Sequence, residues 1–213
     1  MKKYFLCILM LSVIMLWTYN SEAARPFATD DAGTVEYKMS EVEMGYTWGD
    51  EEGILEFDYV YGLTERMDIG ISFGYTIETE SKNSFTPAEL SLKFAIVPDI
   101  CSASFAYEFG ESIYDINLIC TKVFGQVEVD ANLGYLVNED DENLVTYAVA
   151  LIWAIDEKFA IGTELLGDET GVQNLLVGMR YHIKEGLSVD AGFSKGVGDD
   201  VNNTITVGLH FEF

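Results

Sequence analysis

Residues 67–78 read Met-Asp-Ile-Gly-Ile-Ser-Phe-Gly-Tyr-Thr-Ile-Glu, and this stretch decides the fold. Large apolar or aromatic side chains occupy every odd position, whereas Asp, Gly, Ser, Thr and Glu occupy the even positions. A β-strand places alternate side chains on opposite faces, and a helix would mix these two sets. The stretch therefore predicts a strand with one apolar and one polar face.

The same alternation recurs from residue 40 to the end of the chain. The further segments are 41–48, 54–62, 88–97, 100–109, 112–123, 127–137, 144–154, 159–166, 174–183, 187–194 and 204–213. Short turns such as 63–66 and 184–186 alternate with generally longer acidic connections such as 79–87. Tight periplasmic turns and longer outer loops are typical of outer-membrane barrels. The sequence predicts an all-β fold, a twelve-stranded antiparallel up-and-down transmembrane barrel over 40–213, with both termini periplasmic.

Composition narrows the class of protein further. The chain has 213 residues, with 36 acidic residues against 12 Lys and Arg, and a formal net charge of −24 at pH 7. The shortage of cations argues against a nucleic-acid partner, because phosphate binding needs clustered Lys and Arg. Hydrophobic residues make up 49% of the chain, which is too many for intrinsic disorder. High apolar content with strong acidity fits a protein that sorts the two kinds of residue onto opposite faces.

The first residues have the pattern of a secretory signal peptide. A basic start precedes a nearly unbroken apolar run over 4–17, and small residues stand at the −3 and −1 positions of a cleavage site after Ala23. We expect residues 1–23 to be removed. The segment 24–39 is then expected to be a periplasmic, solvated tail. A divalent ion at Asp30-Asp31, or a tether of the segment in the periplasmic mouth, are the alternatives.

Aromatic residues at the strand ends indicate that the apolar face meets lipid, since a soluble barrel with an apolar interior would show the same period. The middle of that face carries mostly Ile, Leu, Val and Ala, and rings gather towards both ends. Two aromatic girdles that flank an aliphatic band match the two interfaces of a bilayer. The rings are Tyr46, Trp48, Tyr75, Tyr107, Phe109, Tyr114, Tyr135 and Tyr147 at the loop ends, and Tyr59, Tyr61, Phe94, Trp153, Phe159, Tyr181, Phe211 and Phe213 at the turn ends.

Glycines support the same orientation. Glycine weakens a strand and marks crowding or close approach, so a bias to one face predicts a crowded, concave interior on that side. Within the expected strands the glycines all fall on the polar face, namely Gly45, Gly62, Gly70, Gly74, Gly134, Gly162, Gly178, Gly192 and Gly208.

The last strand, 204–213, ends on an aromatic residue, Phe213. This ending resembles the sorting signal that the barrel-insertion machinery of bacteria reads. We therefore expect the Gram-negative outer membrane as the location, with that machinery, outer-membrane lipid and lipopolysaccharide as partners. Acidic runs at 50–52 and 139–142 could meet lipopolysaccharide through Ca²⁺ or Mg²⁺; solvated loops are the simpler interpretation.

Two segments of the mature chain resemble a bacterial outer-membrane family. Residues 24–34 (Ala-Arg-Pro-Phe-Ala-Thr-Asp-Asp-Ala-Gly-Thr) resemble its opening, and residues 61–70 (Tyr-Gly-Leu-Thr-Glu-Arg-Met-Asp-Ile-Gly) resemble its first periplasmic turn and next strand. Residues 117–125 and 132–135 also fit. The family is labelled the phenol-degradation meta-pathway (MetA) family, or simply transporter. The resemblance implies an outer-membrane barrel that passes small, often aromatic or hydrophobic, compounds, and no catalytic residues.

The face opposite the apolar one supplies the candidate lining of a pore, and most of its charged residues are carboxylates. These positions are Glu41, Glu43, Glu56, Asp58, Asp68, Glu78, Glu89, Lys93, Glu108, Asp115, Glu128, Asp130, Glu164, Arg180, His182, Asp190, His210 and Glu212. A hydrated lumen of this kind favours cations and neutral solutes and repels anions. Barrels of about 8 strands are filled by side chains and those of about 16 hold an open channel. We predict a porin-like passive channel for small neutral or cationic solutes, with a closed structural or partner-binding barrel as the alternative.

A membrane hydrolase is the third hypothesis, and the histidines do not favour it. His182 and His210 both fall on inward positions near the periplasmic ends of their strands. An omptin site would lie at the extracellular mouth, and a phospholipase triad would face lipid. We therefore expect a protein that is not an enzyme, with no catalytic residue, no metal and no cofactor.

The cysteines Cys101 and Cys120 are neighbours if residues 110–111 form a two-residue hairpin turn. Both then lie on the lipid face in an oxidising compartment, where a disulfide can persist. The pattern allows that disulfide; two small apolar residues without a bond are the alternative.

Overall fold

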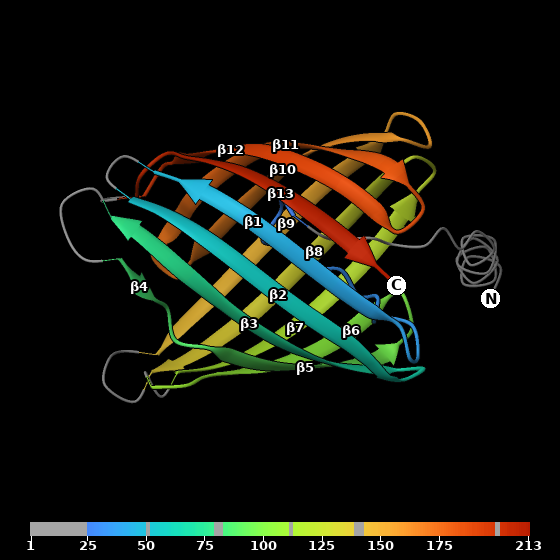
Figure 1. Ribbon diagram of the computed structural model, residues 1–213, viewed down its shortest axis with the longest axis horizontal. Coiled ribbons are helices and arrows are strands. Elements are labelled where there is room, and N and C mark those ends of the chain that lie inside the picture. The colour runs from blue at the N-terminus through green and yellow to red at the C-terminus, as the bar shows by residue number, and fades with distance from the viewer. Residues whose placement is uncertain (1–24, 50–51, 79–82, 111–112, 139–142, 199–200) are drawn as a thin grey trace, which may run out of the picture.

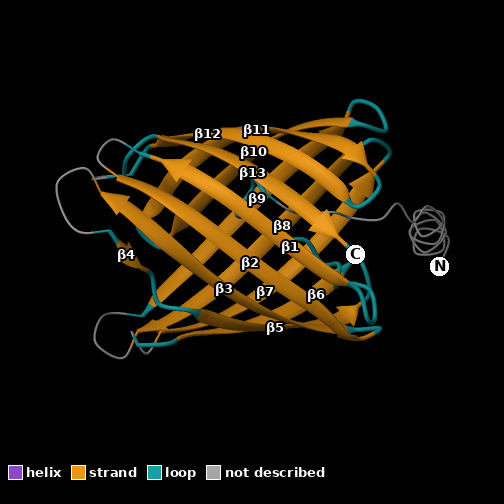
Figure 2. Cartoon of the chain, viewed as in Figure 1, coloured by secondary structure: helices purple, strands orange, loops and turns teal. Residues whose placement is uncertain are grey.

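The computed structural model describes residues 25–213, except 50–51, 79–82, 111–112, 139–142, 199–200 and the side chain of Glu78. The predicted signal peptide, 1–23, and most of the two acidic runs lie outside the described residues. Within the described part the chain forms β-strands and no helix, and twelve of the strands close into an antiparallel barrel (Figure 1 and Figure 2). No described stretch makes a helix with the length and apolarity needed to cross a membrane.

Successive strands are neighbours around the ring, apart from one short strand outside it. The barrel strands are β1 (Ser40–Trp48), β2 (Glu52–Thr64), β3 (Met67–Glu78), β5 (Glu89–Val97), β6 (Cys101–Glu108), β7 (Ile113–Phe124), β8 (Val127–Asn138), β9 (Leu144–Ala154), β10 (Phe159–Asp168), β11 (Gly171–Lys184), β12 (Leu187–Gly196) and β13 (Thr204–Glu212). The predicted strands are confirmed, with ends that differ by a few residues. The short strand β4 (Ser84–Phe85), which pairs with β3, was not predicted because two residues carry no period.

The ring closes where the first strand pairs with the last. In this seam Glu41 pairs with Glu212 and Glu43 with His210. At its end, the Ser40 N–H donates to the Phe213 carbonyl over 2.8 Å, and the Phe213 N–H donates to the Ser40 carbonyl over 2.9 Å. Closure leaves no free sheet edge, and lipid demands that backbone groups be satisfied in this way.

The stretch that decided the fold also fixes which face is outside. In β3 the side chains of Ile71 and Phe73 are 43% and 40% exposed, whereas Asp68 is 5% exposed. The same contrast recurs in the other strands, whose exposed positions are large apolar residues and whose buried positions are mostly polar or small. The prediction that apolar side chains face outwards is confirmed.

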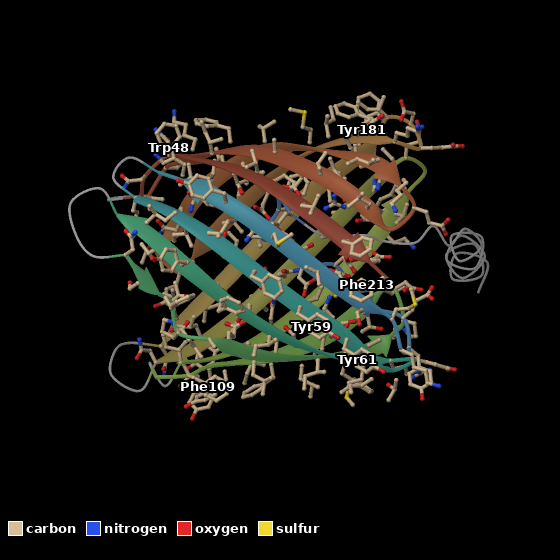
Figure 3. The ribbon with its side chains drawn as sticks, viewed as in Figure 1. Trp48, Tyr59, Tyr61, Phe109, Tyr181 and Phe213 are labelled. Carbon is tan, nitrogen blue, oxygen red and sulfur yellow. The ribbon has the colours of Figure 1, made fainter. Side chains whose placement is uncertain are left out.

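Rings gather near the two ends of the barrel (Figure 3). Trp48 and Phe109 lie towards the loop end, and Tyr61, Tyr181 and Phe213 lie towards the turn end, where the chain terminates (Figure 3). The exposed positions between them are mostly aliphatic, with a few rings such as Phe73 and Phe105. This outer surface has the layered polarity of a bilayer.

The register predicted for the cysteines is confirmed, because Cys101 pairs directly with Cys120 across β6 and β7. The two sulfurs lie 3.5 Å apart and both thiols are free. The disulfide that the pattern allows is not formed in this structure, and the two residues are unbonded, as in the other interpretation.

Mild oxidation should join the two thiols within one chain, because the sulfurs are already neighbours. Treatment of the purified barrel with diamide should abolish thiol titration without making dimers. In Cys120→Ser the remaining Cys101 thiol should stay titratable or link two chains. Two thiols that survive oxidation in the folded barrel would contradict this expectation.

Candidate functional site: the lumen and the segment along its wall

Residues 25–39, called the wall segment from here on, lie inside the barrel. Pro26, Phe27, Thr29, Asp31 and Ala32 are all buried. The prediction of a solvated tail is therefore wrong for this segment. The physical reason lies in the inward face of the strands. Its polar side chains form hydrogen bonds with the backbone of the segment, and its glycines leave space for the side chains of the segment.

The first part of the wall segment packs against glycines on the inner face of β10, β11 and β12. The Pro26 ring lies where a side chain at Gly178 or Gly192 would be, and the Phe27 ring lies where one at Gly162 would be. Phe27 also forms an apolar cluster with Ala150, Ile152 and Leu176. Glycine was predicted to mark crowding inside the barrel, and the crowding group at these positions is the wall segment itself.

The middle of the wall segment is held by hydrogen bonds from its backbone to inward side chains. The Thr29 N–H and hydroxyl each donate to Glu164 Oε1 over 2.5 Å. The Asp30 N–H donates to Asn132 Oδ1 over 2.8 Å, and Asn132 Nδ2 donates back to the Asp30 carbonyl over 2.7 Å. Buried backbone groups must be paired, and here β10 and β8 provide the partners.

The next residues continue the same pattern around the barrel. The Ala32 N–H donates to Thr121 Oγ1 of β7 over 2.8 Å, and Ser102 of β6 donates to the Ala32 carbonyl over 2.6 Å. The Val35 N–H donates to Asp68 of β3 over 3.0 Å, and the Lys38 N–H donates to the Gly62 carbonyl of β2 over 2.9 Å. The segment therefore follows the inner wall from β12 and β11 round to β2, where it turns into β1.

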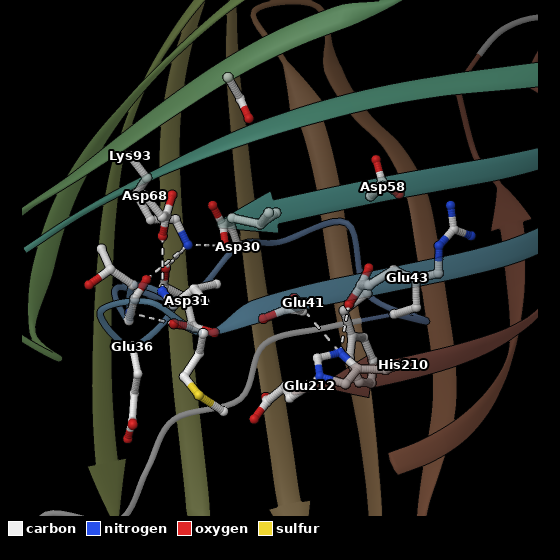
Figure 4. Close-up of a pocket in the computed structure, with 18 of the residues that line it drawn as sticks. Asp30, Asp31, Glu36, Glu41, Glu43, Asp58, Asp68, Lys93, His210 and Glu212 are labelled. Atoms are coloured by element: carbon white, nitrogen blue, oxygen red, sulfur yellow. Dashed lines mark hydrogen bonds and ion pairs between the residues drawn. The ribbon is translucent and has the colours of Figure 1, made fainter. Parts of the chain in front are cut away.

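Lys93 fastens the segment to β5 (Figure 4). Its Nζ donates to Asp30 Oδ1 over 2.8 Å and to the carbonyls of Asp31 and Gly33 over 3.2 and 3.0 Å. The side chain of Lys93 is 16% exposed and that of Asp30 is 37% exposed, so the ammonium group is largely withdrawn from water and the carboxylate only partly. A cation and three oxygen acceptors together make this the strongest single attachment of the segment.

Arg25 makes the corresponding attachment at the start of the segment. Its Nη2 donates to Glu56 over 2.6 Å, and Arg180 donates to the Arg25 carbonyl over 2.8 Å. Burial alone would lower the pKa of Arg25. The negative charges of Glu56 and Asp58 raise this pKa by more, so it lies above its ordinary value and the cation is retained.

A side chain added at Gly178 should loosen the wall segment. In Gly178→Ala the new methyl group meets the Pro26 ring, and overpacking of this kind costs about 1–3 kcal/mol. Protease cleavage within residues 25–39, followed by mass spectrometry of the detergent-solubilised barrel, should speed up. Gly49→Ala is the matched control, because its nearest neighbours lie 3.7 Å away. Equal cleavage rates in the two variants would contradict the packing described here.

Two cavities remain beside the wall segment. The larger, of about 1500 Å³, opens towards the turn end and is lined by the segment together with inward side chains of the strands. The smaller, of about 330 Å³, lies towards the loop end. Ala28, Asp115 and Asn117 line both cavities, so the two spaces meet beside these residues. The part of the lumen beside these three residues is called the constriction from here on.

The charged residues predicted from the sequence divide into two groups. Those that line the larger cavity are Glu41, Glu43, Asp58, Asp68, Glu89, Lys93, Asp115, His182, His210 and Glu212. Those on inward register positions outside its lining are Glu56, Glu108, Glu128, Asp130, Glu164, Arg180 and Asp190. Glu164 is 1% exposed and serves the wall segment, so it does not face open solvent. The side chain of Glu78 lies outside the described residues.

The two histidines have different surroundings. His210 lies between carboxylates, with Nδ1 3.1 Å from Glu43 and Nε2 3.1 Å from Glu212. Both ring nitrogens therefore face carboxylates and neither faces a hydroxyl or thiol nucleophile. His182 lines the larger cavity.

Comparison with known proteins supports the fold. No family model matches the chain, and no curated protein matches its sequence. Among solved structures, the KdgM porin is similar with a TM-score of 0.66 and 12% identity, over 81% of this chain and 99% of that one. The toluene transporter TbuX of Ralstonia pickettii is similar with a TM-score of 0.51 and 8% identity, over 83% and 88%. Outer membrane phospholipase A of Escherichia coli has a TM-score of 0.51 and 12% identity, over 93% and 96%. At these identities the likeness is one of fold: the chain has the architecture of twelve-stranded outer-membrane barrels.

Proposed function

We propose that the protein is a passive outer-membrane channel for small neutral or cationic solutes. The observation that carries the proposal is the charge of the larger cavity. Fourteen carboxylates line it against four Lys and Arg side chains. Two of those cations are already paired, Arg25 with Glu56 and Lys93 with Asp30. A wet, narrow space with this balance attracts cations and repels anions.

Aromatic or hydrophobic neutral compounds are the solute class that we favour. The resemblance to the phenol-degradation meta-pathway family supports this class, and so does the likeness in fold to a toluene transporter. A polyanion fits poorly: the KdgM porin has been described in complex with oligogalacturonate, and the present cavity would repel such a chain. A neutral phenol carries no charge that conflicts with the lining.

The orientation belongs to the same proposal. We place the turn end and both termini in the periplasm, because short turns there and longer loops outside are the rule for such barrels. The insertion machinery would read the last strand with its terminal Phe213. The wall segment then lies on the periplasmic side of the constriction, together with the larger cavity.

Solute uptake into liposomes tests the proposal. Three six-carbon solutes of nearly equal size are compared: neutral glucose, cationic glucosamine and anionic gluconate. Proteoliposomes should swell readily in glucose and in glucosamine and only slowly in gluconate. Phenol should reduce the current through single channels more than cyclohexanol does, since the two differ mainly in the aromatic ring. Fast gluconate entry would contradict the charge argument, and equal effects of the two ring compounds would contradict the aromatic class.

The carboxylate at the constriction should set the charge selectivity. Asp115 lines both cavities, and one of its oxygens is buried without a hydrogen-bond partner. In Asp115→Asn the ratio of potassium to chloride permeability should fall severalfold, since the charge is lost where the two cavities adjoin. Asp156→Asn, at an exposed turn outside the lining of both cavities, is the control and should keep the ratio of the native channel. An unchanged ratio in Asp115→Asn would show that this carboxylate does not set the charge selectivity.

A closed barrel without conductance is the second candidate, and the wall segment is the observation that favours it. The segment fills part of the lumen, and a barrel filled in this way can serve as a rigid platform for its loops. Single-channel recording separates the two candidates directly, because a closed barrel gives no current.

A further inference from the structure

Four side chains meet at the seam of the barrel, on the inside and near the turn end (Figure 4). This seam cluster consists of Glu41 and Glu43 on β1 and His210 and Glu212 on β13. His210 Nδ1 lies 3.1 Å from Glu43 and 3.8 Å from Glu41, and its Nε2 lies 3.1 Å from Glu212. One ligand atom each of Glu41, His210 and Glu212 lies within 4.8 Å of the other two.

A further carboxylate stands beside the seam cluster without a hydrogen-bond partner. Asp190 of β12 is 7% exposed, and neither of its oxygens has a hydrogen-bond partner among the described residues. Its carboxylate lies where a side chain at Gly208 would be, two residues before His210, and it interacts electrostatically with His210 and Glu43. Arg180, directly across from it on β11, balances part of this charge.

We propose that the seam cluster binds one divalent transition-metal ion of the zinc type. His210 supplies the imidazole nitrogen, and Glu41 and Glu212 supply carboxylate oxygens, while Glu43 and Asp190 contribute negative charge at close range. This site does not depend on whether the lumen conducts.

The donor set suits such an ion. Zinc and its neighbours in the first transition row take imidazole nitrogen together with carboxylate oxygen at about 2.0–2.2 Å. Calcium and magnesium prefer oxygen alone, so the histidine selects against them. The three ligand atoms lie within 4.8 Å of one another, whereas bonds of about 2.0–2.2 Å to one ion hold ligand atoms about 3.5 Å apart. Glu212 faces Nε2 and Glu41 faces Nδ1, so one of the two Glu side chains must rotate to reach an ion on the other ring nitrogen. On binding, the ring nitrogen that becomes a ligand releases any proton it carries to solvent.

The position of the cluster gives the ion a structural consequence. Glu41 and Glu43 lie on the first strand of the barrel, and His210 and Glu212 lie on the last. An ion held between them would bridge the first and the last strand of the barrel, which pair with each other where the ring closes. The four side chains also line the larger cavity, so an ion can reach them from solvent.

Calorimetric titration of the refolded, untagged mature barrel with Zn²⁺ tests the proposal. One Zn²⁺ should bind per chain. His210→Gln should weaken binding by at least about tenfold, because even the loss of a side chain that only supports a metal ligand costs about that much affinity. Absorption of bound Co²⁺ in the visible range gives a second readout of the same site. His182→Gln is the matched control, since it removes the other histidine of the same cavity. His182 acts on Glu212 only through its charge, so binding should change by less than about twofold.

A second pair of variants distinguishes the loss of a metal ligand from misfolding of the His210 variant. Glu212→Gln should weaken Zn²⁺ binding, whereas Glu89→Gln, an acid of the same cavity on β5, should not. Heat-modifiable migration on gels confirms that each variant is a folded barrel. Absence of a stoichiometric Zn²⁺ site, or equal affinity in His210→Gln and the native chain, would overturn the proposal. Loss of binding in His182→Gln would overturn it as well.

Discussion

A chain that lacks residues 25–34 should conduct several times better than the full mature chain. These residues occupy the inner wall on which the larger cavity and the constriction border, and Ala28 lines both spaces. Their removal exposes Glu164 and Asn132, now covered by Thr29 and Asp30. It also takes away Arg25, Asp30 and Asp31, so the net charge of the lumen changes little and the preference for cations should persist while the current grows. Single-channel recording on refolded protein measures both effects.

Two controls accompany this truncation. Heat-modifiable migration should show that the shortened chain is still a barrel, because the strand pairings do not involve these residues. A peptide of residues 25–34, added from the turn side, should reduce the enlarged current if its contacts are those described. A conductance equal to that of the full chain would show that the wall segment does not restrict the lumen.

Replacement of Lys93 by methionine should destabilise the protein and loosen the wall segment. The ammonium group is the partner of Asp30 and of two carbonyls, and Asp68 interacts with it as well. Removing one partner of a fully buried ion pair costs about 3–5 kcal/mol, because the other charge is left without compensation. Asp30 is 37% exposed, so water compensates part of its charge and the expected loss is about 1–3 kcal/mol. Urea titration in lipid vesicles should show this loss in the free energy of unfolding, together with faster proteolysis of the wall segment.

The Lys93 prediction has an internal check. Adding Asp30→Asn to Lys93→Met removes the carboxylate that has lost its partner. The double variant should therefore recover part of the lost free energy of unfolding, as expected of two residues that interact. Lys158→Met, at an exposed turn, should leave the free energy of unfolding nearly unchanged. A small effect of Lys93→Met, or strictly additive effects of the two substitutions, would show that the pair does not hold the segment.

The strands could be predicted from the sequence because their signal is local. Alternation over 67–78 reveals both a strand and its two faces, and the pairing of Cys101 with Cys120 follows from a short turn. The position of the wall segment could not be predicted in the same way. It has no period, and its partners are distant: Glu164, Asn132 and Thr121 lie 135, 102 and 89 residues from the atoms they bind.

One signal in the sequence did point to the wall segment. Gly162, Gly178 and Gly192 share the polar face of neighbouring strands, and each leaves room for Pro26 or Phe27. The bias indicated crowding inside the barrel without revealing which group is responsible. The seam cluster is hidden for a similar reason: alternation places Glu43 and His210 on the inward face, but only closure of the ring brings residues 167 positions apart together.

The reversal potential of the native channel tests the central claim most directly. With a gradient of potassium chloride across a planar bilayer, a lumen lined by fourteen carboxylates and four cations should reverse at a voltage of the sign set by potassium. The shift should shrink as the salt concentration rises, because counterions screen exposed carboxylates. A reversal potential of the sign set by chloride, or a folded and inserted barrel that carries no current, would contradict the account.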